Sequence, residues 1–206
     1  MSYVLIKRII DLVLTVLLTV VFFPVWFIVP LLIKLQSKGS IIYSHERLGK
    51  NGRKFNLYKF RTMVEDADEI LFKKDKNLLK KFKKGDWKLK NDPRITKLGR
   101  LLRNLTIDEF PQFWNVLRGE MSIVGPRAYV ERELKEQIKK YPKTKPLIKT
   151  ILSVKPGITG PWQTSGRNEI PFDERARMDY EYARSHSFWQ DLLILLKTPK
   201  AMISKW

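Results

Sequence analysis

The stretch LTIDEFPQFWNVLRGEMSIVGPR, residues 105–127, guides the interpretation of the whole chain. Thr106 followed three residues later by Glu109 matches a capping box, which predicts the start of a helix. Asp108 and Glu109 would then lie in the first helical turn, where backbone N–H groups and the helix dipole favour anions. Apolar residues follow at helical spacing: Phe110, Phe113, Trp114 and Leu117.

The second half of this stretch predicts a helix end, a strand and a turn. Gly119 is expected to end the helix, and the short apolar run 121–124 is typical of a strand. The turn Gly125-Pro126 then delivers Arg127. Two carboxylates, a helix N-terminus and an arginine can bind metal and phosphate. Acids in a first turn are also ordinary capping residues, so the local pattern leaves both interpretations open.

Composition limits the chemistry that is available. The 206 residues suit one domain, and 44% hydrophobic residues can form a core. The absence of cysteine excludes disulfides, a thiolate nucleophile and a cysteine metal site, and the two histidines, His45 and His186, are far apart in sequence. An enzyme of this composition must use carboxylates, arginines and lysines. The formal charge of +19 suits polyanions: nucleic acid, anionic lipid or a phosphorylated substrate.

The apolar segment 9–33 is long enough for a membrane. As one straight helix its 25 residues would extend roughly 37 Å, against a bilayer core of about 30 Å. Pro24 in the middle predicts a kink, because proline removes a helical hydrogen bond. Basic residues on both flanks favour a re-entrant helix over a spanning one, and the two remain alternatives. Asp11 is expected near the interface, hydrated or paired with Lys7 or Arg8.

The part after residue 36 predicts a compact α/β domain. A short strand at 41–43, a loop at 45–49, an Asn51-Gly52 turn and a strand at 55–60 indicate a β-hairpin. Helical patterns occupy 65–71, 95–103, 129–141 and 172–183, and 146–152 is less regular. The apolar segment 188–206 suits a partly interfacial helix. Segment 73–90 holds nine lysines and is either solvated or lies on anionic lipid.

Cations and a shaped loop add candidates for phosphate binding. Lys59 and Arg61 end the second strand, where they are either solvated or bind phosphate. Three glycines and two prolines within 154–168 predict a shaped loop that presents Arg167. The chain carries no Walker loop, GxGxxG, HExxH or CxxC, which excludes a P-loop nucleotide hydrolase. A carboxylate nucleophile beside a cation-binding carboxylate remains able to act on phosphorus.

Several motifs in order then identify a resemblance. They are YKFRTM at 58–63, DPRIT at 92–96, IDEFPQ at 107–112, VGPR at 124–127 and KPGITG at 155–160. The chain resembles the monotopic phosphoglycosyl transferases, the bacterial sugar transferase family, from about Lys7 to the C-terminus. The resemblance implies transfer of a sugar-1-phosphate from a UDP-sugar to undecaprenyl phosphate, with Mg²⁺ as cofactor and UMP as product. It also implies a re-entrant helix on the cytoplasmic face of the bacterial inner membrane and a role in starting lipid-linked glycans such as capsule or exopolysaccharide.

The resemblance assigns roles by position. Asp108 corresponds to the family's covalent nucleophile and, with Glu109, to its metal-binding pair. The arginines at 127 and 167 match arginines that contact phosphate, and Lys59 and Arg103 fall at similar basic positions. Asp179 matches an acid near the site whose role stays open, and Pro24 matches the proline of the membrane kink.

Three departures from the family pattern are visible. Phe23 precedes Pro24 where the family often has serine, and Ala128 follows Arg127 where it often has proline. The loop PWQTSGR at 161–167 resembles the branch that handles hexose phosphates such as galactose or glucose. Many members of that branch carry extra N-terminal membrane helices, which this chain does not show.

The resulting prediction is an α/β fold: a mostly helical cytoplasmic domain with a short β-hairpin and interfacial amphipathic helices, on an N-terminal re-entrant helix. Residues 1–36 form the membrane helix and residues 37–206 the catalytic domain. The predicted partners are the UDP-sugar, undecaprenyl phosphate and anionic lipid, with no nucleic acid and with a homodimer allowed. A single-displacement mechanism, in which Asp108 only binds metal, is the mechanistic alternative. The alternative function is a membrane-tethered basic module that binds lipid or nucleic acid without catalysis.

Overall fold

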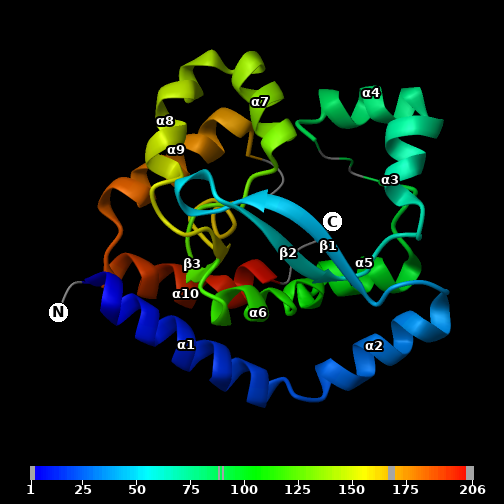
Figure 1. The fold of residues 1–206 in the computed structure, drawn as a ribbon, viewed down its shortest axis with the longest axis horizontal. Helices are drawn as coiled ribbons and strands as arrows, with labels where there is room; N and C mark the ends of the chain where they lie inside the picture. The colour runs from blue at the N-terminus through cyan, green and yellow to red at the C-terminus, as the bar shows by residue number, and fades with distance from the viewer. Residues whose placement is uncertain (1–2, 88, 90, 167–169, 203–206) are drawn as a thin grey trace.

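The computed structural model describes residues 3–87, 89, 91–166 and 170–202. Helices predominate and a β-hairpin is present, as predicted; a second, parallel two-stranded sheet was not predicted, because one of its strands lies in the segment 154–168 that was expected to be a loop (Figure 1). The helices are α1 Tyr3–Val21, α2 Val25–Gln36, α3 Ala67–Glu69, α4 Lys76–Lys84, α5 Lys97–Asn104, α6 Gln112–Leu117, α7 Glu131–Lys140, α8 Lys145–Ile151, α9 Phe172–Ser185 and α10 Phe188–Met202. The strands are β1 Ile42–Leu48, β2 Lys54–Phe60, β3 Ser122–Val124 and β4 Gly157–Thr159.

The apolar N-terminal segment forms a bent pair of helices, α1 and α2. Pro24 directly precedes α2, which confirms the predicted break. Considered alone, no helix of the described chain is long and apolar enough to cross a membrane. Taken together, α1 and α2 are long and apolar enough to cross a membrane, but the pair is bent by 63° (Figure 1).

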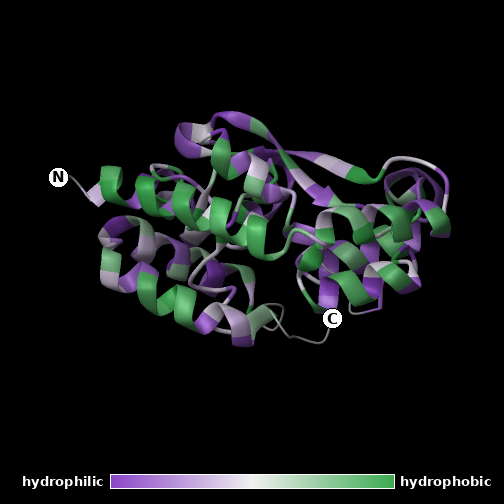
Figure 2. Cartoon of the chain, turned by 90° about the horizontal axis from the view of Figure 1, so that it is seen from below, coloured by the Kyte–Doolittle hydropathy of each residue, from purple (hydrophilic) through white to green (hydrophobic). Residues whose placement is uncertain are grey.

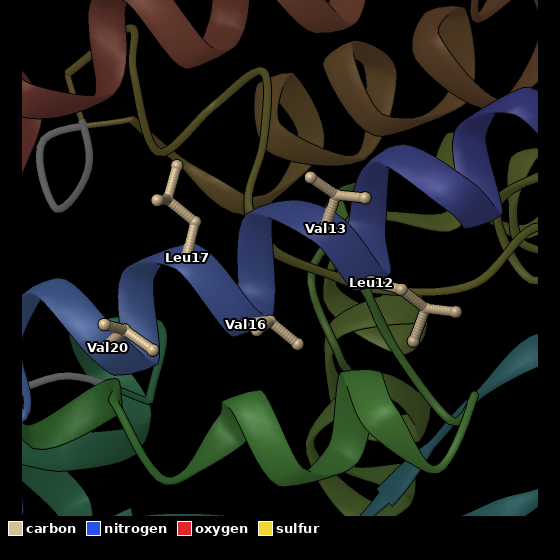
Figure 3. Close-up of a pocket in the computed structure, with 5 residues that line it drawn as sticks. All are labelled: Leu12, Val13, Val16, Leu17 and Val20. Carbon is tan, nitrogen blue, oxygen red and sulfur yellow. The ribbon is translucent and has the colours of Figure 1, made fainter.

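The helix pair shares the main hydrophobic core with the rest of the chain. Val29 and Ile33 of α2 are buried in one cluster with Phe60, Phe110 and Phe113. The opposite side of the pair is apolar and exposed. Hydrophobic residues dominate this face when the molecule is seen from below (Figure 2). An apolar hollow on α1 is lined by Leu12, Val13, Val16, Leu17 and Val20 (Figure 3).

The prediction that Asp11 stays hydrated is wrong; of its predicted partners Lys7 acts on it by its charge, but no ion pair of 4.0 Å or less joins the two among the described residues. Asp11 is buried at 4% exposure. Its Oδ1 accepts hydrogen bonds from Ser122 Oγ and from the Ile123 backbone N–H, both at 2.9 Å. The two donors belong to β3, so a carboxylate of α1 is joined to the strand that leads to Arg127. Burial of this polar side chain is tolerated because both donors are satisfied.

Polar contacts also join α1 to α10 and α6. Asp191 of α10 pairs with Lys7 and accepts hydrogen bonds from Tyr3 Oη at 2.5 Å and Tyr182 Oη at 2.6 Å. Arg8 donates to the carbonyls of residues 116 and 117, at 2.6 and 3.0 Å, at the end of α6. The Val116 carbonyl also accepts from the Gly119 backbone N–H at 2.9 Å, and Arg8 adds a side-chain donor to both carbonyls in the last turn of α6.

The strands β1 and β2 form the predicted hairpin, but β1 is longer than predicted. Residues 45–48, expected to be a loop, continue β1 because Arg47 and Leu48 pair with Phe55 and Lys54 of β2. The turn at residues 50–52 has Asn51 and Gly52 at positive φ, as its sequence predicts. The hairpin runs across the middle of the molecule between α2 and α7 (Figure 1).

The lysine-rich segment 73–90 lies against α7. Asp75 caps α4 by accepting a hydrogen bond from the Leu78 backbone N–H at 2.8 Å. Lys83 pairs with Glu136 of α7 at 3.0 Å, and Asp86 pairs with Lys140. Figure 1 places α4 across the molecule from α1 and α2. This position favours the solvated interpretation of the segment; Lys88 and Lys90 are outside the described residues.

Candidate active site

The Asp108-Glu109 pair lies on a single 3₁₀ turn, Ile107–Glu109, and the predicted capping box is wrong. Thr106 adopts a left-handed conformation with φ 57°, and its hydroxyl donates to the Met202 carbonyl at 3.1 Å instead of capping. The α-helix begins only at Gln112 and ends at Leu117, and Gly119 follows at φ 77°, as predicted for a helix end. The acids are therefore held by tertiary contacts.

Asp108 is a buried carboxyl group. Its side chain is 7% exposed, and this burial raises its pKa to about 6 because water no longer solvates the charge. The charges of Lys59 and Arg103 oppose this rise in pKa, and the charge of Glu109 adds to it. At neutral pH the group remains mostly ionised, and its desolvation makes the carboxylate a stronger nucleophile than an exposed one.

Lys59 lies within ion-pair distance of both acids. It belongs to β2, and its Nζ lies 2.6 Å from Glu109 Oε1 and 3.8 Å from Asp108 Oδ2. The fully buried Asn115 of α6 holds β2 in the position that brings Lys59 to the acids. Its Oδ1 accepts from the Tyr58 N–H at 3.2 Å, and its Nδ2 donates to the Asn56 carbonyl at 2.7 Å. One side chain of α6 thus holds the strand that carries the lysine.

Arg103 reaches the pair from α5. Thr96 caps this helix by accepting a hydrogen bond from the Gly99 backbone N–H at 2.9 Å. Gly99 lies so close to the chain just after β2 that a Cβ there would be 1.9 Å from the Thr62 carbonyl oxygen, so a larger residue cannot pack in this position. Arg103 Nε donates to Thr62 Oγ1 at 2.9 Å. This tight packing places the guanidinium within electrostatic range of Asp108.

Arg127 and Asp179 form a second group. The backbone N–H of Arg127 and the hydroxyl of Tyr129 donate to Asp179 Oδ2, at 3.1 and 2.7 Å. Asp179 is fully buried, and burial raises its pKa to about 7. The guanidinium of Arg127 stacks over Trp162, with its Cζ 5.3 Å from the ring centroid. Asp179 therefore positions the Arg127 loop, which answers the role left open by the sequence.

Arg47 joins the two groups. It extends from β1, its Nη1 donates to the Ala128 carbonyl at 3.2 Å, and the Leu48 N–H donates to the Tyr129 carbonyl at 2.8 Å. Burial lowers the pKa of Arg47 to about 10; Arg127 lowers it further and Glu109 raises it. The β-hairpin therefore brings Lys59 to the acid pair and Arg47 to the Arg127 loop. Arg167 is outside the described residues, so its predicted contact with phosphate stays a prediction.

Comparison with known proteins identifies the family. The family model described as bacterial sugar transferase matches residues 2–205. The chain belongs to the bacterial sugar transferase family. This membership agrees with the resemblance that the ordered motifs predict, and the acid pair with its lysine lies within the matched region.

Three relatives illustrate what this family member is similar to. The UDP-galactose-lipid carrier transferase of Erwinia amylovora is 40% identical over 94% of the chain and 39% of its own length. The undecaprenyl-phosphate galactose phosphotransferase of Salmonella typhimurium is 41% identical over 85% of the chain and 37% of its own length. The exopolysaccharide production protein ExoY of Rhizobium meliloti is 39% identical over 95% of the chain and 84% of its own length. The family member thus spans about two fifths of the first two relatives and most of the third.

The donor set of this family member fits Mg²⁺. Within the described part of the chain, no group of three or more histidine or acidic side chains could enclose a metal ion. Proteins commonly hold Mg²⁺ by one or two carboxylates, with substrate phosphates and water completing the octahedron. The adjacent carboxylates of Asp108 and Glu109 suit that mode, and Glu109 is the more accessible of the two.

The sequence interpretation missed several residues of the site. Asn115 carried a detectable sign, since it is a polar residue within an otherwise apolar helical run. Arg47 and Trp162 carried none, because each is distant in sequence from the acid pair and their contacts require the folded chain. The sequence also draws attention to Asp11, but its burial against β3 depends on the tertiary structure.

Proposed function

We propose that this chain transfers a sugar-1-phosphate from a UDP-sugar to undecaprenyl phosphate and releases UMP, as a first step of lipid-linked glycan synthesis. The observation that carries the proposal is the buried Asp108 carboxylate with Glu109 and Lys59 against it. Relatives named as galactose and glucose phosphotransferases of undecaprenyl phosphate support a hexose as the transferred sugar. Their names also support a polyprenyl phosphate as the acceptor.

The proposed reaction has two displacements. The Asp108 carboxylate attacks the β-phosphorus of the UDP-sugar, the bond from that phosphorus to the bridging oxygen breaks, and UMP leaves with the oxygen. A phosphate oxygen of undecaprenyl phosphate then attacks the same phosphorus, and the bond to Asp108 breaks to restore the carboxylate. Lys59 and Arg103 stabilise the charge that develops on the phosphoryl oxygens. Mg²⁺, held by Glu109 and Asp108 with the diphosphate, would neutralise further charge.

We further propose that the chain sits on the cytoplasmic face of the bacterial inner membrane, with α1 and α2 as a re-entrant pair. The exposed apolar face of that pair supports this position (Figure 2). Exposed apolar residues of α6 and α10 extend it: Trp114, Leu117, Trp189, Leu193 and Leu196. The bend of 63° and the basic flanks at both ends support a helix pair that returns to the side it entered.

The reaction is tested by UMP release. The purified protein in nanodiscs is incubated with undecaprenyl phosphate, Mg²⁺ and a panel of UDP-sugars, and UMP is quantified. We expect release from one hexose donor, dependence on undecaprenyl phosphate for more than one turnover, and loss with EDTA. Folded protein that releases no UMP from any donor would contradict the proposed function.

The orientation is tested by labelling. Single cysteines at Ser2 and Ser40 are introduced into the cysteine-free chain and exposed to a membrane-impermeant thiol reagent in sealed vesicles of known sidedness. We expect both positions to react from the cytoplasmic side only. Reaction from opposite sides would replace the re-entrant pair by a spanning segment.

A further inference from the structure

We propose that Arg47, Arg127 and Arg175 together form a binding site for a phosphate monoester dianion beside the acid pair. The inference rests on the proposed function in one respect, since that reaction makes the UMP phosphate the expected occupant. The sequence resemblance already implies that Arg127 contacts phosphate; the new part of the inference is that Arg47 and Arg175 bind the same phosphate. We call these three residues the arginine cluster.

The cluster is built around one aromatic ring. Trp162 is buried, and the guanidinium carbons of Arg127 and Arg175 lie 5.3 and 5.5 Å from its ring centroid. Arg175 comes from α9 and Arg127 from the loop after β3, so two separate segments bring their charges to the same ring. Arg47 approaches from β1 and is held by the Ala128 carbonyl, next to Arg127. Like charges gathered in this way repel one another unless an anion joins them.

Buried donors of the cluster have no partner within the protein. They are the Nε atoms of Arg47, Arg127 and Arg175, together with one terminal nitrogen of Arg175. Arg175 is only 1% exposed, so these donors are also shielded from solvent. An unsatisfied buried donor of this kind is costly, and phosphate oxygens accept several guanidinium hydrogen bonds at once.

Another buried arginine of the same chain shows what a purely structural role looks like. Arg94 is 4% exposed and forms a forked pair with Asp92, at 2.8 Å from Nε and 2.5 Å from Nη2. It also donates to the Ala67 carbonyl at 3.2 Å. By contrast, within the described ranges no ion pair of 4.0 Å or less joins Arg47, Arg127 or Arg175 to a carboxylate.

The acids near the cluster do not neutralise it. Asp179 already accepts from Tyr129 and from the Arg127 backbone N–H, and burial raises its pKa to about 7, so it is partly protonated at neutral pH. Glu133 is buried nearby and raises the pKa of Arg47 by its charge, but it forms no ion pair among the described contacts. Asp86 and Glu109 also act on cluster arginines by their charge, but they pair with Lys140 and Lys59.

The position of the cluster suits the nucleotide side of the donor. Arg47 pairs with Phe55 in the β-hairpin, and Lys59 lies four residues further along β2. At about 3.3 Å per residue this separates the two backbone positions by roughly 13 Å. Both side chains lie on the same face of the β-hairpin, and the charge of Glu109 raises the pKa of Arg47. The UMP phosphate, expelled from the β-phosphorus when Asp108 attacks, would therefore lie on the side of the arginine cluster.

The experiment measures binding by isothermal titration calorimetry in nanodiscs, with UMP, uridine, inorganic phosphate and farnesyl phosphate as probes. We expect UMP to bind and uridine to bind at least about tenfold more weakly, because a charge-assisted phosphate contact contributes about that much. Arg175→Met and Arg47→Met are expected to weaken UMP binding about tenfold or more each. Arg184→Met, an exposed arginine on the same helix α9 that stacks over Tyr180, removes the same charge and should leave binding unchanged.

The outcomes separate the possibilities. Equal binding of UMP and uridine, or unchanged UMP binding in both cluster variants, would overturn the inference. If Arg175→Met does not fold, Arg47→Met decides alone, since Arg47 is only half-buried. Stronger binding of farnesyl phosphate than of UMP, lost in the same variants, would support the site and assign it to the lipid acceptor. UMP binding through the cluster without UMP release from any donor would contradict the proposed function and leave the site standing.

Discussion

Replacing Asp108 with asparagine is expected to reduce UMP release at least about 1,000-fold, the order of loss seen when an enzyme's nucleophile is removed. The substitution keeps the shape of the side chain but removes the negative charge that attacks phosphorus. The measurement is the initial rate of UMP release with the preferred donor, at saturating undecaprenyl phosphate and Mg²⁺.

The matched control for this loss is Asp173→Asn. Asp173 is an exposed acid in the first turn of α9, and its replacement removes the same charge from the surface. Its rate should stay within about twofold of the parent protein, because surface substitutions away from a site change little. A rate for Asp108→Asn near that of the control would place the chemistry on another residue.

The same variant is expected to be more stable than the parent at pH 7. The folded-state pKa of Asp108 is about 6 and the unfolded value is 3.8, so the folded state holds the proton more tightly. Stability therefore falls as pH rises from about 4 to about 6, and the full loss, on the order of 1–3 kcal/mol, persists above pH 6. Asparagine carries no charge and avoids this loss. The free energy of unfolding is measured between pH 4 and 7 with EDTA present.

This stability result bears on function because it separates a catalytic carboxylate from a structural one. An acid retained for packing should not destabilise the fold in its ionised form. If Asp108→Asn were equally or less stable at pH 7, the contacts of the carboxylate would stabilise the fold by at least as much as its desolvation destabilises it. The description of the site would then have to be revised.

Asp11→Ala is expected to destabilise the fold by about 2–4 kcal/mol, because two buried donors of β3 lose their acceptor at about 1–3 kcal/mol each. These donors are Ser122 Oγ and the Ile123 N–H, both 2.9 Å from Asp11 Oδ1. Since β3 leads to Arg127, UMP release should fall as well. Thermal unfolding in nanodiscs and the UMP assay measure the two effects.

Two variants of α1 control this prediction. Asp11→Asn keeps an acceptor oxygen and should lose less stability than Asp11→Ala. Val13→Ala, on the exposed side of α1, should change stability within about 0.5 kcal/mol. If Asp11→Ala were as stable as Val13→Ala, then α1 would be an anchor that contributes little to the catalytic fold.

Features that depend on a few adjacent residues could be predicted from the sequence. Pro24 breaks the apolar segment, Asn51-Gly52 turns the β-hairpin and Gly119 follows the end of α6. Each follows from backbone rules that act within one turn of chain. The acid pair was also identified from sequence, first as one of two interpretations and then through the ordered motifs.

Features that depend on distant partners were missed or misplaced. The capping box failed because Thr106 bonds to Met202, and residues 45–48 became strand because β2 supplies their hydrogen bonds. Asp11 is buried because a strand more than a hundred residues away offers two donors.

The chain by itself therefore determined its family, its broken N-terminal helix and the candidate acid pair. Only the tertiary structure decided which cations meet those acids and how the carboxylate of Asp108 is desolvated. The physical reason is the distance along the chain over which each effect acts. Backbone preferences depend on a few adjacent residues, whereas burial and charge depend on residues that are distant in sequence and close in space. Lys59 and Glu109, fifty positions apart, become neighbours only when Asn115 ties β2 to α6.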